Sequence, residues 1–319
     1  MTNITAALPG LAVGDALGVP AEFVHRPALK HHPVTGMQGY GTHQQPPGTW
    51  SDDNSLAFCL AESLCHGYDL TDLARRFVNW RDQAYWTAHG RVFNIGIATS
   101  EAISRLRSGT SPVLAGGAAE ADNGNGSLIR ILPLIAYLTN KPINEHYRIM
   151  AEVSSLTHAH VRSVFACFIY CEYALLLLDG ADKMAALQAI QQTVNQFINE
   201  YKLIDKAAEL ILFQRVLENP NVPGLSTSLL HCTEAEIASS RYVLHTLEAS
   251  LWCFLTTDSY AEAVLKAVNL GSDTDTTGCV TGGLAGLCYG ADAIPKNWLD
   301  ILARKGDIID LGNQLTKVL

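Results

Sequence analysis

Apolar residues recur at intervals of three and four along almost the entire chain, which is the spacing of one face of an α-helix. This spacing predicts helices over residues 4–18, 55–65, 70–83, 92–106, 128–137, 144–156, 161–178, 183–200, 202–217, 233–254, 260–268, 276–289 and 297–304. Alternating apolar and polar residues between turn signals, which would indicate strands, do not recur, and neither does any repeat length. The sequence therefore predicts an all-α fold, a single compact orthogonal helical bundle in which residues 1–319 form one domain.

The first predicted helix carries glycines at every fourth position, namely Gly10, Gly14 and Gly18. Residues with this spacing share one helix face, and without side chains they let another backbone approach closely. We expect this face to pack against a second helix. The stretch from His25 to Pro47 is instead rich in His, Pro, Gly and Gln, and we expect it to form a loop that covers another part of the protein.

Composition narrows the class of protein. Hydrophobic residues make up 48% and charged residues 17% of the 319, which is typical of a large packed core. The net charge is −9 and no run of Lys or Arg occurs, so we expect no nucleic-acid partner. Glu172 interrupts the most apolar run, and we expect neither a membrane span nor a signal peptide. The eight cysteines form no C-x-x-C pair, which indicates a reducing, cytoplasmic location.

An acidic motif near the far end of the chain most strongly indicates function. Asp273 and Asp275 alternate with hydroxyl residues, and glycines stand on both sides. Carboxylates two residues apart converge only where the backbone is irregular or is entering a helix. Several converging hard oxygen atoms suit a divalent cation.

A second stretch, which contains Ser51, Asp52 and Asp53, also precedes an apolar helical run. Either stretch alone could be an ordinary helix cap with acids in the first turn. Because both occur in a chain with few charges, we interpret them as one site. Their oxygen ligands are enough for two metal ions ~3.5–4 Å apart, and they are Ser51, Asp52, Asp53, Asp273, Asp275 and Thr276. Histidine is absent from both motifs, so Mg²⁺ or Mn²⁺ is expected rather than Zn²⁺.

Two other interpretations of the far motif fail on context. In haloacid-dehalogenase-type phosphatases the same string follows a strand near the N-terminus, whereas here it follows a helical run near the end of the chain. An EF-hand would need an acid at the twelfth loop position, where this sequence has Leu284.

Two stretches between helices could bind a ligand. The glycine-rich residues 116–126 lead into a predicted helix N-terminus, whose backbone N–H groups could hold a phosphate, although such loops often only turn the chain. His158 lies between two predicted helices. It could bind a ligand, although a buried histidine that is satisfied within the protein is commoner.

Five motifs in order resemble those of the ADP-ribosylglycohydrolases, and the match runs from Gly14 to about Leu287. They are Gly14-Asp15-Ala16-Leu17-Gly18 with Glu22-Phe23; Trp50-Ser51-Asp52-Asp53; Gly124-Asn125-Gly126 with Arg130; Leu156-Thr157-His158; and Ser272-Asp273-Thr274-Asp275-Thr276-Thr277-Gly278. The resemblance implies an all-α fold with a cleft that holds two Mg²⁺ or Mn²⁺ ions on the six ligands named above. It implies Glu22, Asp52 and Asp275 as catalytic residues. It also implies that ADP-ribose is bound by Asn94, Gly96, Asn123, Gly124, Asn125, Gly126 and His158, with its pyrophosphate on the glycine loop.

The chain departs from the family pattern at four positions. Ser51 replaces the usual Thr and keeps the ligand oxygen, and Asn54 stands where a hydroxyl is usual. Asn94 stands where arginine-directed relatives typically carry Asp, and an amide pairs less strongly with a guanidinium than a carboxylate does. Arg241 occupies the place of an expected Gly.

The leading hypothesis is a metal-dependent hydrolase that cleaves the glycosidic bond between ADP-ribose and an acceptor, either a protein side chain or a small molecule. The alternative is a non-catalytic ADP-ribose-binding member of the same fold. A third is a hydrolase on this scaffold that acts on an unrelated glycoside or nucleotide. The sequence does not identify the acceptor.

Overall fold

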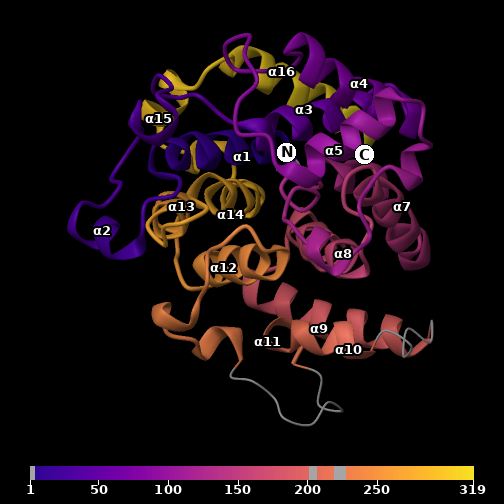
Figure 1. Ribbon diagram of the computed structural model, residues 1–319. Helices are drawn as coiled ribbons and strands as arrows, with labels where there is room; N and C mark the ends of the chain where they lie inside the picture. The colour runs from indigo at the N-terminus through magenta and orange to yellow at the C-terminus, as the bar shows by residue number, and fades with distance from the viewer. Residues whose placement is uncertain (1–3, 201–206, 219–227) are drawn as a thin grey trace.

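The computed structural model describes residues 4–200, 207–218 and 228–319, and within these ranges it contains helices and loops but no strand (Figure 1). The α-helices are α1 (Ile4–Gly18), α2 (Arg26–His31), α3 (Asp52–Leu64), α4 (Leu70–Gln83), α5 (Ile97–Arg107), α6 (Ile135–Leu138), α7 (Ile143–Ser155), α8 (Val161–Leu178), α9 (Lys183–Glu200), α10 (Ala207–Leu210), α11 (Gln214–Leu217), α12 (Val243–Leu255), α13 (Tyr260–Val268), α14 (Thr274–Tyr289), α15 (Lys296–Ile301) and α16 (Lys305–Leu315). This confirms the predicted all-α fold.

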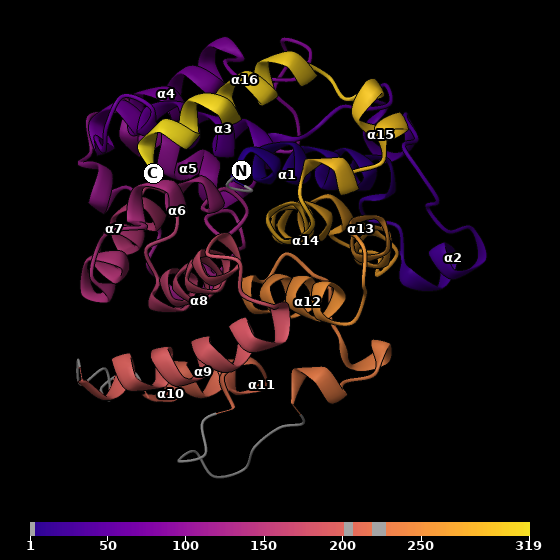
Figure 2. The same ribbon diagram turned by 180° about the vertical axis from the view of Figure 1, so that it is seen from behind.

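Helices α1 and α14 lie side by side in the middle of the molecule (Figures 1 and 2). Helices α3 and α16 cover one side of this pair, while α12 and α8 lie on the other side and α13 packs along α14. Helices α9, α10 and α11 form an outer layer beyond α8 and α12. The pair α1 and α14 therefore lies at the centre of the bundle, in contact with α3, α8, α12, α13, α15 and α16.

The glycine stripe of α1 faces a matching stripe on α14. A Cβ atom built on Gly14 would lie 2.0 Å from the carbonyl oxygen of Gly278, and one on Gly10 would lie 2.4 Å from that of Gly282. One on Gly18 would lie 2.3 Å from the backbone nitrogen of Asp275. No side chain fits at such distances, so the two backbones touch, and the stripe brings α1 against the start of the acidic helix.

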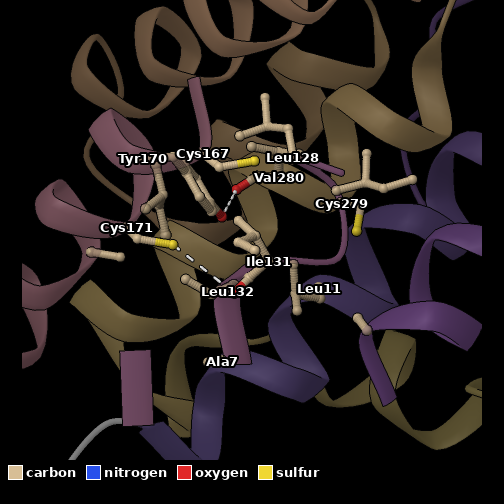
Figure 3. Packing of buried hydrophobic residues seen from close by; sticks show 14 of the residues in the cluster. Ala7, Leu11, Leu128, Ile131, Leu132, Cys167, Tyr170, Cys171, Cys279 and Val280 are labelled. Carbon is tan, nitrogen blue, oxygen red and sulfur yellow. Dashed lines mark hydrogen bonds between the residues drawn. The ribbon is translucent and has the colours of Figure 1, made fainter. Parts of the chain in front are cut away.

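Part of the hydrophobic core lies where α1, α8 and α14 meet the segment 128–132 (Figure 3). Ala7 and Leu11 of α1, Leu128 and Ile131, and the cysteines of α8 pack there, and all of them are at most 2% exposed. The hydroxyl of Tyr170 donates a hydrogen bond to the carbonyl of Val280, 3.0 Å away. This bond satisfies the one polar atom of a ring that is otherwise packed among apolar side chains.

The helices α1 and α8 are long and apolar enough to cross a membrane by composition alone. Within the described part of the protein, however, 89% of the first window and 72% of the second are buried. Their apolar residues therefore contribute to the core, and the most apolar run, which Glu172 interrupts, lies in α8.

Several predicted helix boundaries are wrong, and for two of them the local reason is evident. The helix expected from residue 92 begins at Ile97, because Asn94 has a left-handed φ of 57°. The helix expected over 128–137 is mostly turns and a 3₁₀ helix (132–134), since Pro133 cannot donate the helical hydrogen bond. The helix expected from Thr233 begins at Val243. The helix expected from residue 55 begins three residues earlier, at Asp52, and that expected over 297–304 ends at Ile301.

Two helices were not predicted. The expected loop from His25 to Pro47 contains α2, and the apolar spacing of Ile308, Leu311 and Leu315 in α16 was overlooked. The predicted helix over 202–217 lies partly outside the described residues, and its described part is divided into α10, a 3₁₀ turn and α11.

The contact between α1 and α14 yields a stability prediction. Replacement of Gly14 by Ala should lower the free energy of unfolding by about 2–3 kcal/mol or more, since the methyl group must push two backbones apart. Urea denaturation measures the change. The matched control is Gly306→Ala in exposed α16, where no atom lies within 4 Å of the added carbon and stability should stay equal or rise slightly. Equal effects at both positions would contradict the close contact.

Candidate functional site

The two acidic motifs meet at the N-termini of α3 and α14. Ser51 caps α3, with its hydroxyl oxygen 3.2 Å from the backbone nitrogen of Asp53. The hydroxyl of Thr276, in the first turn of α14, donates to the carboxylate of Asp53 at 2.9 Å. Positions that are far apart in the sequence are thus in direct contact. Neither Asp52 nor Asp273 faces bulk water, since they are only 6% and 2% exposed.

Asp15 of α1 holds the first motif in place. Its carboxylate accepts hydrogen bonds from the backbone nitrogen of Ser51 at 2.9 Å, from the Ser51 hydroxyl at 3.2 Å and from the Asn54 amide at 2.7 Å. Asn54 therefore donates where the family pattern has a hydroxyl. Asp15 was predicted only as part of a motif and not as a site residue. Its position between glycines, on a helix face that packs against another helix, is the sequence feature that could have identified it as a site residue.

Glu22 lies beside the second motif. It follows the short 3₁₀ helix Val19–Ala21, is fully buried, and offers a carboxylate oxygen within 4.8 Å of ligand atoms of Asp273 and Asp275. Glu22 was predicted as a catalytic residue and not as a metal ligand. In the structure it forms, with these two aspartates, a group that could hold a cation.

Among the described residues, three side chains contact the carboxylate of Glu22. His43, from the loop that covers the site, approaches through Nε2, and the Asn94 amide donates at 2.8 Å. Arg241 donates through Nη2 to the other oxygen at 2.5 Å. The loop therefore does reach the site, as expected of residues 25–47. His43 itself was not predicted, since nothing marked it among the four histidines of that stretch.

Asn94 is held by the acids themselves. Its amide nitrogen also donates to Asp275 at 2.9 Å, and its carbonyl oxygen accepts from Arg241 at 3.1 Å. An aspartate at this position could not donate to either acid and would add a further negative charge. The amide thus fits the site chemically, and the left-handed backbone of Asn94 aims it there.

The site concentrates negative charge in a buried place. Burial raises the pKa of Asp15 to about 7 and that of Asp273 to about 6. Burial, together with repulsion from neighbouring carboxylates, also raises the pKa of Asp52, Asp53 and Asp275 well above the usual range. Carboxylates in this state gain stability from a cation that neutralises them.

A cavity of about 240 Å³ opens directly above the acids. Its lining includes these residues: Glu22, Asp52, Asp53, Asn94, Gly96, Ile97, Ala98, Thr99, Ala121, Gly124, Asn125, Gly126, Ile129, His158, Arg241, Asp273 and Thr276. Most of the predicted site residues therefore share one cavity. Ser51 and Asp275 lie behind it, bonded to Asp15 and Asn94 respectively.

The glycine loop forms the opposite wall of the cavity. The side chain of Asn125 donates to Asp273 at 2.6 Å, so this predicted substrate-binding residue positions an acid. Asn123 does not line the cavity, because its amide contacts the carbonyl of Glu120 and the hydroxyl of Ser163. The expectation that a regular helix follows the loop is wrong, since residues 126–130 are turns.

The start of α5 also lines the cavity, and of its residues only Gly96 was predicted as a site residue. Gly96 caps this helix, and Ile97, Ala98 and Thr99 form its first turn, whose backbone N–H groups lack helical partners. Because the helix was expected to begin earlier, at residue 92, its N-terminus could not be placed at the site.

His158 lies against the glycine loop. Its Nδ1 is 2.8 Å from the Thr157 hydroxyl, and added Cβ atoms on Gly124 and Gly126 would both lie 3.3 Å from its Nε2. Burial, with a smaller contribution from the nearby Arg130 charge, lowers its pKa to about 3. The ring is therefore neutral at ordinary pH, and only glycine fits beside it.

The donor set suits a hard divalent cation. The group of three carboxylates contains oxygen donors alone, which fits Mg²⁺ or Mn²⁺ better than Zn²⁺. Within the described residues, the buried Asp52 Oδ1 has no hydrogen-bond partner, as expected of an oxygen that is reserved for a ligand.

The comparisons with known proteins agree with one another. The family model described as ADP-ribosylglycohydrolase matches residues 1–319. The chain is 32% identical to a protein of Serratia proteamaculans named ADP-ribosylarginine hydrolase Tri1, over 97% of this chain and 77% of that relative. It is 27% identical to a protein of Rhodospirillum rubrum named ADP-ribosyl-[dinitrogen reductase] glycohydrolase, over 94% of this chain and 90% of that relative.

A solved structure is similar over nearly its full length. The chain described as an ADP-ribosylglycohydrolase-related protein complex superposes with a TM-score of 0.79 at 31% sequence identity, covering 99% of this chain and 98% of that chain. The likeness therefore extends to the whole fold that positions the cavity.

The neutral state of His158 predicts how stability depends on pH. The folded protein binds this proton only near pH 3, whereas the unfolded chain binds it below about 6.5. The stabilisation is therefore complete above pH 6.5 and is lost as the pH falls toward 3. Relative to His158→Gln, the wild type should lose up to about 1.4 kcal/mol of unfolding free energy per pH unit in this window. Urea denaturation at several pH values tests this, and parallel pH profiles of the two proteins would contradict it.

Proposed function

The chain belongs to the ADP-ribosylglycohydrolase family, and from that premise we propose that it is a metal-dependent ADP-ribosyl hydrolase. It is a hydrolase that acts on the glycosidic bond of ADP-ribose, as the names of its relatives indicate. The dependence on Mg²⁺ or Mn²⁺, the number of ions and the acceptor are our proposals. The acceptor is a protein side chain or a small molecule.

One observation carries the metal dependence. The buried carboxylates of Glu22, Asp273 and Asp275 converge within 4.8 Å of one another beside the cavity. Arg241 is the single guanidinium in contact with them among the described residues. One positive charge is too little for this number of buried acids, so a cation would lower the repulsion.

The ligands of that cation would come from both motifs. Glu22, Asp273 and Asp275 would hold one ion, and Ser51, Asp52, Asp53 and Thr276 supply the additional oxygen atoms for a second. Bound there, Mg²⁺ or Mn²⁺ supplies Lewis acidity that orients the ribose hydroxyls and favours attack by water.

The chain's own residues perform the rest of the chemistry. Asp15 fixes the capping turn of α3, and Asn125 fixes Asp273, so the acids cannot swing away when substrate enters. The unpaired Oδ1 of Asp52 is available to accept a proton from the attacking water. The glycine loop and the first turn of α5 present backbone N–H groups to the pyrophosphate, so binding needs no basic patch.

We also propose a reducing compartment such as the cytoplasm. All eight cysteines are buried or partly buried, and burial raises the pKa of thiols such as Cys59, Cys167 and Cys279. Such thiols are poor nucleophiles and behave as small apolar side chains. Buried thiols of this kind are compatible with a reducing environment.

A panel of substrates tests the proposed function. The purified protein is incubated with peptides ADP-ribosylated on arginine or on serine and with small ADP-ribosylated acceptors, with Mg²⁺, with Mn²⁺ or after chelation. Release of ADP-ribose that requires the metal is expected for at least one acceptor. Tight binding of ADP-ribose without turnover of any acceptor would instead indicate a non-catalytic binding protein.

Asp273→Asn should lower the rate of metal-dependent turnover by at least about 10³-fold, because an amide cannot supply the anionic ligand. The helical circular dichroism signal should remain, since the side chains have the same shape. Calorimetric titration with Mn²⁺ measures the loss of binding. Asp300→Asn, on the surface of α15, is the matched control and should bind and turn over like the wild type.

A further inference from the structure

A second cavity adjoins the first on the side of Phe23 and Ser272. It has a volume of about 320 Å³ and is lined by Phe23, Ser240, Arg241, Tyr242, Ser272 and Asp273. Arg241 and Asp273 line both cavities, whereas the glycine loop and His158 line only the first. If ADP-ribose occupies the first cavity with its ribose over the acids, the acceptor leaves toward the second.

Arg241 stands at the junction of the two cavities. Its Nη2 group contacts Glu22 and Asn94, and its guanidinium carbon lies 4.6 Å from the centre of the Phe23 ring. Within the described residues, no hydrogen bond engages its Nη1 group, and the side chain is 52% exposed. One donor of a permanent cation therefore remains available at the point where the acceptor would be attached.

The backbone on both sides of the junction is fixed. The carbonyl of Arg241 accepts from the backbone nitrogen of Asn125 at 3.1 Å, and the backbone nitrogen of Phe23 donates to the carbonyl of Ser272 at 2.7 Å. Phe23 and Ser272 both have left-handed φ values, 67° and 66°. Two strained residues that hold each other indicate a wall of fixed shape rather than a surface loop.

We infer that Arg241 selects the acceptor, and that the preferred substrate class is ADP-ribose joined to the acceptor through oxygen rather than to a guanidinium. This inference rests on the proposed function. An acceptor oxygen can accept a hydrogen bond from the guanidinium of Arg241, whereas the guanidinium of an ADP-ribosylated arginine would meet a like charge that is already paired with Glu22.

The chemistry of the bond points the same way. In hydrolysis, the bond between the anomeric carbon and the acceptor oxygen breaks, and its electron pair leaves with that oxygen. The oxygen of water bonds to the carbon, and a proton from this water ends on the acceptor. Negative charge therefore develops on the departing oxygen, where a fixed cation stabilises the transition state more than the ground state. A departing guanidine develops no such charge.

Asn94 supports the same selection. Its amide hydrogens point to Glu22 and Asp275 and its oxygen to Arg241. The residue therefore holds the guanidinium of Arg241 in place and offers no free carboxylate to the guanidinium of a substrate.

Two peptides of identical sequence, one ADP-ribosylated on serine and the other on arginine, test the inference. For the wild type, kcat/KM should be at least about tenfold higher with the serine-linked peptide. Arg241→Gln should lower kcat for that peptide by about 10- to 100-fold with little change in KM. It should not lower the rate for the arginine-linked peptide. Arg241→Lys, which keeps the charge, should recover part of the loss.

Arg75→Gln is the matched control, because it removes an exposed guanidinium of α4 that pairs with Asp72 and does not line either cavity. It should leave both rates unchanged. Equal or faster turnover of the arginine-linked peptide by the wild type would overturn the inference while supporting the proposed function. An equal fall in both rates for Arg241→Gln, with unchanged ADP-ribose affinity, would also overturn it. Absence of turnover with every acceptor would overturn the proposed function itself.

Discussion

The backbone contact between α1 and α14 is the constraint on which the rest of the structure depends. Gly10, Gly14 and Gly18 leave no side chain between the two helices, so α1 lies directly against the first turn of α14. Asp15 and Asp275 are thereby brought into one buried region, although the chain between them forms most of the bundle. The close packing of α1 and α14 therefore positions the acids of the site as well as filling the core.

Burial of so many acids has a cost, which the surrounding polar groups partly offset. Asp15 accepts from the turn that Ser51 caps, Asp273 accepts from Asn125, and Asp53 accepts from Thr276. These hydrogen bonds hold the carboxylates in fixed positions without neutralising them, and their pKa values stay raised. A site of this kind is preorganised for a cation and poorly stabilised without one.

Charge also separates the two ends of the proposed substrate path. The pyrophosphate end is lined by glycines, the first turn of α5 and a neutral His158, so it binds through backbone dipoles. The acceptor end carries the guanidinium of Arg241 and the ring of Phe23. An acidic protein can therefore bind an anionic ligand at one end and distinguish its acceptor at the other.

Much of this molecule follows from the sequence by itself. Helical spacing predicted most helices, and α4, α8, α9 and α13 begin and end at the predicted residues, because amphipathic spacing is a local property of the chain. The glycine stripe and the two acidic motifs are also visible in the sequence, and the residue types of the motifs already indicate a cation. What only the tertiary structure decided is the set of partners. Glu22 joins Asp273 and Asp275, Asn94 bonds to acids rather than to an acceptor, and Arg241 reaches the junction of two cavities. The chemistry of a buried charge depends on its neighbours in space, and the sequence does not state which residues those will be.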